Sequence, residues 1–286
     1  MRILITGARG QLGQALQQAL SGEDLILKDL PEFDLTRSDS ESQIVAVRPT
    51  VILHAGAYTD VDGAEREPSQ ARAVNAQGTA CVARAAAALN ARLIYVSTDY
   101  VFDGTQTTPY REEDIPHPIN VYGQSKREGE IAALRECPNT LVVRTAWLYG
   151  HAGNNFVKTI MRLASEKPLL EVVGDQRGCP TNADDLALVL KDLLGNDLRG
   201  ICHVTNTGDC TWGDGYSLIY SYGEKMNGQP VPLGAVVAPG EEVDVSINFK
   251  APEKIGSYTS AWQMVTPRGI SFGAKEETLL AVIVVQ

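Results

Sequence analysis

A tyrosine and a lysine four positions apart are the pair in this sequence best suited to proton transfer. Tyr122 and Lys126 lie in the run VYGQSKREGE, which we expect to be helical. Positions i and i+4 share one face of a helix, so the ammonium of Lys126 can lie beside the phenol of Tyr122. A free phenol has a pKa near ~10, and a neighbouring cation lowers it by favouring the phenolate. The pair is therefore predicted to act as a general acid near neutral pH.

A hydroxyl group suited to holding a carbonyl oxygen precedes this pair. Thr98 follows the β-rich run 92–97, in the segment STDYVFDG. We expect Thr98 and Tyr122 to orient and polarise a substrate carbonyl while Tyr122 delivers a proton to its oxygen. The sequence thus predicts a catalytic group of Thr98, Tyr122 and Lys126 that reduces a ketone with hydride from a nicotinamide.

A glycine-rich turn near the N-terminus has the spacing that a dinucleotide needs. The strand-like run 2–6 is followed by GARGQLG, with glycine at positions 7, 10 and 13. Gly7 allows a tight turn, Gly10 lets phosphates approach the backbone, and Gly13 lets the next helix pack on the strand. The cofactor predicted by this turn is NADPH or NADH.

The choice between these two cofactors depends on the end of the second predicted strand. Asp29 lies there, 22 residues after Gly7, where a carboxylate accepts hydrogen bonds from the adenosine ribose. This position favours NADH. Arg9 and Lys28 are close in sequence to the same region and could meet the 2′-phosphate of NADPH, so the preference stays open.

Two further segments are expected to contact the cofactor. Asp34 and Leu35 would lie near the adenine. Small residues after the third predicted strand leave room for the dinucleotide to cross the sheet, at Ala57 and the adjoining Tyr58 and Thr59.

The elements that must position these residues alternate between short β-rich runs and Ala-rich helical stretches. Expected strands are 2–6, 24–27, 51–54, 92–97 and 140–144, and expected helices are 14–20, 40–47, 69–89 and 125–134. Such alternation is typical of βαβ units, and unbroken apolar runs such as LIYV are typical of strands covered on both faces. We predict an α/β fold, a Rossmann-type doubly wound parallel sheet, as an NAD(P)-binding domain over residues 1–205.

The pattern changes after Trp212 to alternating apolar and polar residues. Three such runs, 216–222, 243–249 and 258–264, are separated by turn-forming residues. Short alternating runs with regular turns favour antiparallel strands. We predict a small antiparallel β-sandwich over residues 206–286. It is incomplete unless GICHVT, residues 200–205, supplies its first strand rather than a strand of the preceding sheet.

Composition excludes several classes of partner. The chain of 286 residues carries a net charge of −10 without a cluster of basic residues, which disfavours nucleic acids and anionic membranes. Its four histidines are far apart, so no metal site is expected. No apolar run approaches the ~20 residues that span a bilayer, and the N-terminus has the pattern of a strand rather than a signal peptide. We expect a cytoplasmic location.

The runs GARGQLG, AYTDVDGAE, STDYVFDG, VYGQSKREGE and RTAWLYG resemble, in order and spacing, those of dTDP-4-dehydrorhamnose reductases, members of the extended short-chain dehydrogenase/reductase family. The resemblance covers residues 1–212. It implies reduction of the 4-keto group of a dTDP-linked sugar, dTDP-4-dehydro-L-rhamnose, and departs from the family at His54 and Gly56. The implied cofactor contacts are Gly10, Gln11, Leu12, Asp29, Asp34, Leu35, Ala57, Tyr58, Thr59, Tyr122 and Lys126, and the implied sugar-nucleotide contacts are Thr98, Asp99, Tyr122 and Trp147.

The remaining residues resemble a different family. From residue 213, the runs TWGDGYSLIYSYGEKMNG and GSYTSAWQMVTPRGISFG are similar to the four-tryptophan, Ig-like domain of selective-autophagy receptors. That resemblance implies a protein partner and the loss of the usual C-terminal substrate lid. Two alternatives to an active reductase therefore stay open: a cofactor-binding chimera without turnover, and a related sugar-nucleotide reductase or epimerase. Homodimerisation is also left open.

Overall fold

The computed structural model of the chain describes residues 1–106, 108–166, 178–205, 217–223, 226, 229–232, 250, 254, 256–265 and 279–285. The chain divides into two compact units, Met1–Asn206 and Thr207–Gln286, and each is described by itself. Within the described ranges, no helix is both long enough and apolar enough to span a bilayer.

A six-stranded, fully parallel sheet forms the centre of the first unit. From edge to edge its strands are β2 (Asp24–Lys28), β1 (Arg2–Thr6), β3 (Val51–His54), β4 (Arg92–Thr98), β5 (Thr140–Thr145) and β8 (Gly200–His203). The predicted strands are confirmed, and β8 assigns the run that was left open to this sheet. Strand order reverses between β1 and β3, and the carboxyl ends of strands at such a point border the ligand-binding crevice of open α/β sheets.

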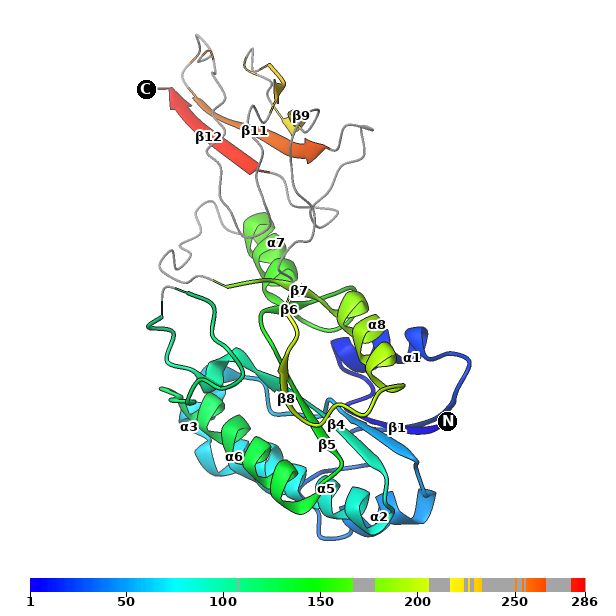
Figure 1. Cartoon of the computed structure of the whole chain (residues 1–286). Helices are drawn as coiled ribbons and strands as arrows, with labels where there is room; N and C mark the ends of the chain where they lie inside the picture. The colour runs from blue at the N-terminus through cyan, green and yellow to red at the C-terminus, as the bar shows by residue number, and fades with distance from the viewer. Residues whose placement is uncertain are drawn as a thin grey trace. The chain divides into compact units, whose positions relative to one another are not determined.

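Helices cover both faces of the sheet (Figure 1). On one face lie α1 (Gln11–Ala19) and α8 (Ala183–Leu193), and on the other lie α2 (Ser40–Val47), α5 (Thr79–Ala88) and α6 (Val121–Glu136). Successive residues of a strand point to opposite faces, so Ile3 and Ile5 pack in one apolar core while Leu4 packs in the other. The doubly wound prediction is therefore confirmed for this unit.

Shorter elements connect the layers. These are α3 (Val61–Arg66), α4 (Pro68–Arg72), the π-helix η1 (Ala73–Gly78), the 3-10 helix η2 (Asp99–Val101), β6 (Leu148–Tyr149), α7 (Phe156–Glu166) and β7 (Thr181–Asn182). The helix predicted over 69–89 is divided into α4, η1 and α5. Single π-helical turns inside α-helices are rare and occur frequently at functional sites.

The described part of the second unit contains one antiparallel sheet of four strands. In sheet order these are β10 (Val231–Pro232), β9 (Ser217–Gly223), β11 (Gly256–Val265) and β12 (Leu279–Val285). The strands predicted over 216–222 and 258–264 are confirmed, whereas the run 243–249 lies outside the described residues. The described strands supply one sheet and not the second that a sandwich needs, so the sandwich and its Ig-like character are not supported here.

Candidate cofactor and catalytic site

The turn between β1 and α1 is closed so tightly that two of its positions accommodate only glycine. Gly7 has a φ of 69°, in the left-handed region, and a Cβ there would lie 2.7 Å from the Gly56 Cα. A Cβ on Gly13 would lie 2.1 Å from the Gly7 carbonyl oxygen. The turn is thus fixed against the loop after β3 and against its own helix.

The middle glycine has a different environment. Gly10 is exposed and forms the N-cap of α1, and no side chain caps this helix end. A Cβ on Gly10 would lie 3.3 Å from the Gly7 carbonyl oxygen, a contact that is tight but not a clash. An uncapped helix N-terminus presents backbone N–H groups and the positive end of the helix dipole. The cradle therefore fits an anionic diphosphate.

The next two predicted cofactor residues lie differently. Leu12 is 4% exposed and packs in the core, so only its backbone belongs to the turn. Gln11 lies at the start of α1, and its Oε1 accepts a hydrogen bond of 3.0 Å from Nδ2 of Asn155. Gln11 therefore joins the glycine turn to the segment that leads into α7.

Asp29 lies at the end of β2, beside the turn. Its two carboxylate oxygens accept hydrogen bonds from the backbone N–H groups of Arg9 (2.7 Å) and Leu30 (2.8 Å). The Arg9 guanidinium forms an ion pair of 2.9 Å with Glu32. A cavity of about 430 Å³ opens here, lined by Ala8, Arg9, Gln17, Leu27, Lys28, Asp29, Glu32 and Phe33. The ribose-binding carboxylate and the two candidate cations predicted from sequence thus border one cavity.

The loop after β3, with Ala57, Tyr58 and Thr59, is held by a buried asparagine from the π-helix. Asn75 is 1% exposed, and its Oδ1 accepts a hydrogen bond of 2.8 Å from the Tyr58 N–H. Its Nδ2 donates to the Tyr58 carbonyl oxygen at 3.0 Å and to Ser125 Oγ, on α6, at 2.9 Å. Asn75 therefore links the loop after β3 to α6.

The segment that was expected near the adenine approaches the same loop. A Cβ on Gly56 would meet the Leu35 Cδ1 at 3.2 Å. Asp34 folds back locally, because its Oδ1 accepts hydrogen bonds from the Thr36 N–H (2.8 Å) and hydroxyl (2.7 Å). Leu35 thus lies against the wall of the crevice.

Tyr122 lies in the first turn of α6, where its phenol is close to Thr98 at the end of β4. Burial raises the pKa of Tyr122 to about 12, and the nearby carboxylate of Asp99 adds to the shift, whereas a side-chain hydrogen bond with Thr98 opposes it. The prediction that the pKa of Tyr122 is lowered is therefore wrong for this structure. The cost of burying the phenolate outweighs any stabilisation by the lysine.

Lys126 points its ammonium into the protein rather than into open solvent. It is 3% exposed, its Nζ donates to the Val96 carbonyl oxygen at 2.7 Å, and it lies 4.3 Å from the centroid of the Tyr95 ring. Burial lowers the pKa of Lys126 to about 7, and the negative charge of Glu130 opposes the shift. Near neutral pH the lysine is consequently divided between its charged and neutral forms.

The hydroxyl of Thr98 is occupied by its neighbours. Thr98 Oγ1 donates to Asp99 Oδ1 at 3.1 Å and accepts a hydrogen bond from the Tyr100 N–H at 3.2 Å. Burial raises the pKa of Asp99. The Tyr100 ring packs edge-on against Tyr122, with 5.5 Å between centroids. Thr98, Asp99 and Tyr122 therefore form one cluster at the carboxyl end of β4.

Trp147 has a strained backbone beside this region. Its φ of 45° is unusual for a bulky residue, and its side chain is 40% exposed. A Cβ on Gly178 would lie 2.5 Å from the Trp147 indole, so this glycine packs directly on the ring. Strained, exposed aromatic residues of this kind are often found in binding sites.

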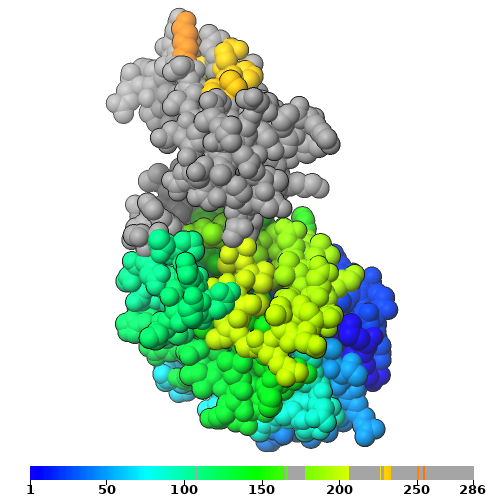
Figure 2. Space-filling model, in the orientation of Figure 1, coloured from blue at the N-terminus to red at the C-terminus, as the bar shows by residue number. Residues whose placement is uncertain are grey.

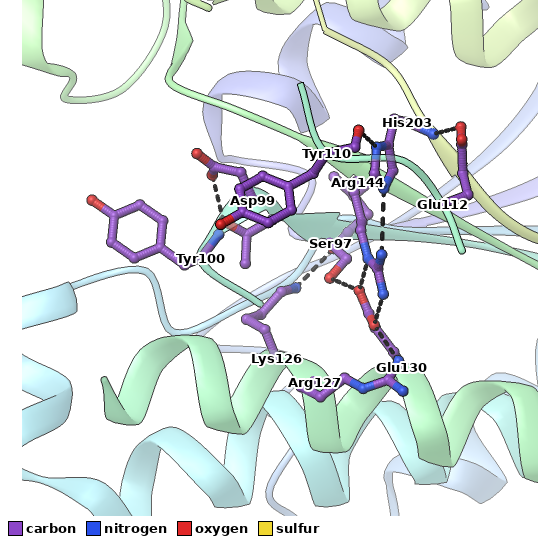
Figure 3. A network of polar contacts seen from close by, with 12 residues as sticks. Ser97, Asp99, Tyr100, Tyr110, Glu112, Lys126, Arg127, Glu130, Arg144 and His203 are labelled. Carbon is purple, nitrogen blue, oxygen red and sulfur yellow. Dashed lines mark hydrogen bonds and ion pairs between the residues drawn. The ribbon is translucent and has the colours of Figure 1, made fainter. Parts of the chain in front are cut away.

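A buried carboxylate on α6, that of Glu130, had no role predicted from the sequence. Glu130 is fully buried and forms an ion pair of 2.8 Å with Arg144 of β5 (Figure 3). Its position four residues after Lys126, on the same helix face, was the available signal. The partner on β5 could not be inferred, because the strand pairing was not known from sequence.

Comparison with known proteins gives a consistent result. A family model described as "RmlD substrate binding domain" matches residues 1–261 and so extends beyond the boundary predicted at 205. The protein named dTDP-4-dehydrorhamnose reductase of Sinorhizobium fredii is 41% identical over 247 residues, which cover 83% of each chain. The protein of the same name from Aggregatibacter actinomycetemcomitans is 44% identical over 223 residues, which cover 74% of this chain and 76% of that protein. The crystal structure of the Bacillus anthracis dTDP-4-dehydrorhamnose reductase, in complex with NADP, is 44% identical with a TM-score of 0.70, and covers 72% of this chain and 75% of its own.

Proposed function

The chain belongs to the dTDP-4-dehydrorhamnose reductase family, and we propose that it reduces the 4-keto group of dTDP-4-dehydro-L-rhamnose to give dTDP-L-rhamnose. The observation that carries the proposal is the half-buried Tyr122 of α6, whose phenol lies close to Thr98 at the carboxyl end of β4. This is the position at which a ketone oxygen can be held and protonated.

NADPH or NADH is the proposed cofactor, and it supplies the hydride. The uncapped start of α1 at Gly10 would hold its diphosphate, and Asp29 would accept hydrogen bonds from the adenosine ribose. Arg9 and Lys28 border the same cavity, which suits a 2′-phosphate. The loop of Ala57, Tyr58 and Thr59 and the neighbouring Asp34 and Leu35 complete the proposed cofactor site.

Tyr122 is the proposed proton donor. Because burial raises its pKa to about 12, the phenol keeps its proton at neutral pH and can transfer it to the developing alkoxide. The Thr98 hydroxyl, which donates to Asp99 in this structure, would turn to the substrate oxygen when the ketone enters. A charged Lys126 beside the resulting phenolate would stabilise it until a solvent proton returns.

The sugar nucleotide is proposed to contact Asp99 and Trp147 in addition to Thr98 and Tyr122. The exposed indole of Trp147 offers an apolar surface on which a sugar or thymine ring can stack. Its strained backbone supports a binding role rather than a purely structural one.

The test is turnover of dTDP-4-dehydro-L-rhamnose, followed as oxidation of NADPH and of NADH, with product analysis. Tyr122→Phe should abolish turnover, by roughly 10²-fold or more, and leave cofactor binding intact. Tyr100→Phe is the matched control, because it removes a hydroxyl from the ring packed against Tyr122 and should retain turnover. Cofactor binding without turnover by the unmodified chain would favour the catalytically impaired chimera, and a different product would favour a related reductase or epimerase.

For residues 206–286 the proposal is narrower. An Ig-like sandwich that contacts a protein partner rests on the alternating strand pattern, of which β9 and β11 are the described examples. Pull-down with the full chain and with residues 1–205 would show whether a partner depends on this segment.

A further inference from the structure

Glu130 occupies a position at which a charge is expensive to bury. Its side chain is fully buried and accepts four hydrogen bonds, from Ser97 Oγ (2.7 Å), Arg127 Nη1 (2.8 Å), and Arg144 Nε and Nη2 (2.8 Å each). Replacing a buried ion pair by apolar side chains is often neutral or stabilising. Stability alone therefore does not explain a carboxylate at this position.

The carboxylate joins β4 and α6, the two elements that carry the proposed catalytic group, to the neighbouring strand β5. Ser97 immediately precedes Thr98 on β4, and Arg144 stands opposite Ser97 in the β4–β5 register. Glu130 is on α6, one helical turn after Lys126. Figure 3 shows the Glu130 carboxylate between Ser97, Arg144 and Arg127, with Lys126 extending from the same helix toward the end of β4.

The guanidinium of Arg144 is held from its other side. Its Nη1 lies 3.3 Å from His203 Nε2, and His203 Nδ1 lies 3.1 Å from the Tyr110 carbonyl oxygen. The Phe102 ring packs against the guanidinium, 5.0 Å from its carbon to the ring centroid. In Figure 2 the residues around β8, in yellow, reach the surface beside the segment that follows β4, in green-cyan. Arg144 is thus fixed in the orientation that pairs with Glu130.

 Two influences on the pKa of Lys126 oppose each other: burial lowers it, and the negative charge of Glu130 raises it. Of the other groups facing the ammonium, the Tyr95 phenol has a pKa raised by burial and stays neutral. Burial lowers the pKa of His54 to about 3, so this ring is neutral as well.

We propose that Glu130 is a positioning residue that keeps Lys126 charged inside the protein, with Arg144 and Ser97 holding its carboxylate in place. The role rests on the proposed function, because a charged lysine matters only if Tyr122 transfers a proton. Burial alone would raise the pKa of Glu130, but Arg144 and Arg127 hold it below its ordinary value. The carboxylate is therefore ionised in the pH range in which Lys126 titrates.

Glu130→Gln tests the charge with little change of shape. Losing the anion should move the titration midpoint of Lys126 down by about one pH unit. From a midpoint of about 7, the charged fraction at pH 7 would then fall from about one half to about one tenth, so turnover falls about fivefold. At pH 5 both proteins carry a charged Lys126, and their turnover should be nearly equal.

The midpoint itself is measured without activity, by NMR of protein labelled at the lysine Cε, with the Lys126 signal identified by its loss in Lys126→Arg. Glu128→Gln is the matched control, since Glu128 lies on the same helix, is exposed and pairs with Arg72 at 3.2 Å. It should leave the midpoint unchanged. Arg127→Gln, at a partly exposed position, should raise the midpoint, because it removes a cation that neutralises Glu130.

An unchanged Lys126 midpoint in Glu130→Gln, or a loss of turnover that is the same at every pH, would overturn the inference. If Glu130→Gln does not fold, the direction of the Arg127→Gln shift decides, and a fall or no change counts against it. Absence of turnover in the unmodified chain would refute the proposed function, while the NMR titration would still decide the role of Glu130.

Discussion

Gly13 and Gly10 of the β1–α1 turn should separate stability from cofactor binding when each is changed to alanine. A Cβ on Gly13 would lie 2.1 Å from a backbone oxygen, which has no rotamer by which to move away. Overpacking typically costs about 1–3 kcal/mol, and a backbone clash belongs at the upper end. With about 2–4 °C per kcal/mol for a unit of this size, Gly13→Ala should lower the melting temperature by roughly 4–12 °C.

Gly10→Ala should behave in the opposite way. Its Cβ would lie 3.3 Å from the Gly7 carbonyl oxygen, so the folded turn can absorb it at a cost below about 1 kcal/mol. The same methyl group would stand between a diphosphate and the N–H groups of α1. A loss of at least 1.4 kcal/mol in binding, about tenfold in Kd, is expected for NADPH.

Thermal unfolding and fluorescence titration with NADPH measure the two effects on the same samples. Gly22→Ala is the control, because a Cβ there would meet nothing within 4 Å. The reasoning is refuted if the Kd of Gly10→Ala for NADPH is within about twofold of that of the unmodified chain. It is also refuted if Gly13→Ala has the same melting temperature as the Gly22→Ala control.

Three other changes test separate parts of the site. Gly178→Ala should raise the KM for the sugar nucleotide and leave the Kd for NADPH unchanged, because its Cβ would displace the Trp147 indole 2.5 Å away; equal effects on both ligands would contradict this. Burial lowers the pKa of His54 to about 3, whereas in the unfolded chain it is about 6.5. Between these two pH values only the unfolded chain binds this proton, so the free energy of unfolding should fall by about 1.4 kcal/mol for each pH unit of acidification. In urea unfolding at pH 7 and 5, His54→Asn should remove this component, and an unchanged pH dependence would rule it out. Arg9→Ala should raise the KM for NADPH more than that for NADH, because the Arg9 guanidinium borders the same cavity as Asp29, the proposed ribose-binding carboxylate. Equal increases in the two KM values would exclude a 2′-phosphate contact.

Local patterns were sufficient to predict the elements of the first unit. The strand at 51–54 and the helix at 40–47 have the predicted bounds. Unbroken apolar runs and helical periodicity are local patterns that a few consecutive residues suffice to show. The glycine turn was predictable for the same reason, since its spacing between a strand and a helix fixes where the chain must turn. The placement of Tyr122 and Lys126 on one helix is likewise a property of spacing alone.

Pairings between distant segments were not available from such patterns. Asn75 donates a hydrogen bond to Ser125, which lies on α6 and 50 residues later in the chain. Arg144 meets Glu130 only because β5 pairs with β4 in the observed register. In the second unit, alternation predicted strands at 216–222 and 258–264 but not what covers them.

The sequence by itself determined which residues could do the chemistry and which elements carry them, because residue type and spacing are local. The tertiary structure decided their charge. It removed water from around both Tyr122 and Lys126, which raised the pKa of Tyr122, contrary to the prediction, and lowered that of Lys126. Desolvation depends on every element packed around a group, and no spacing along the chain encodes it.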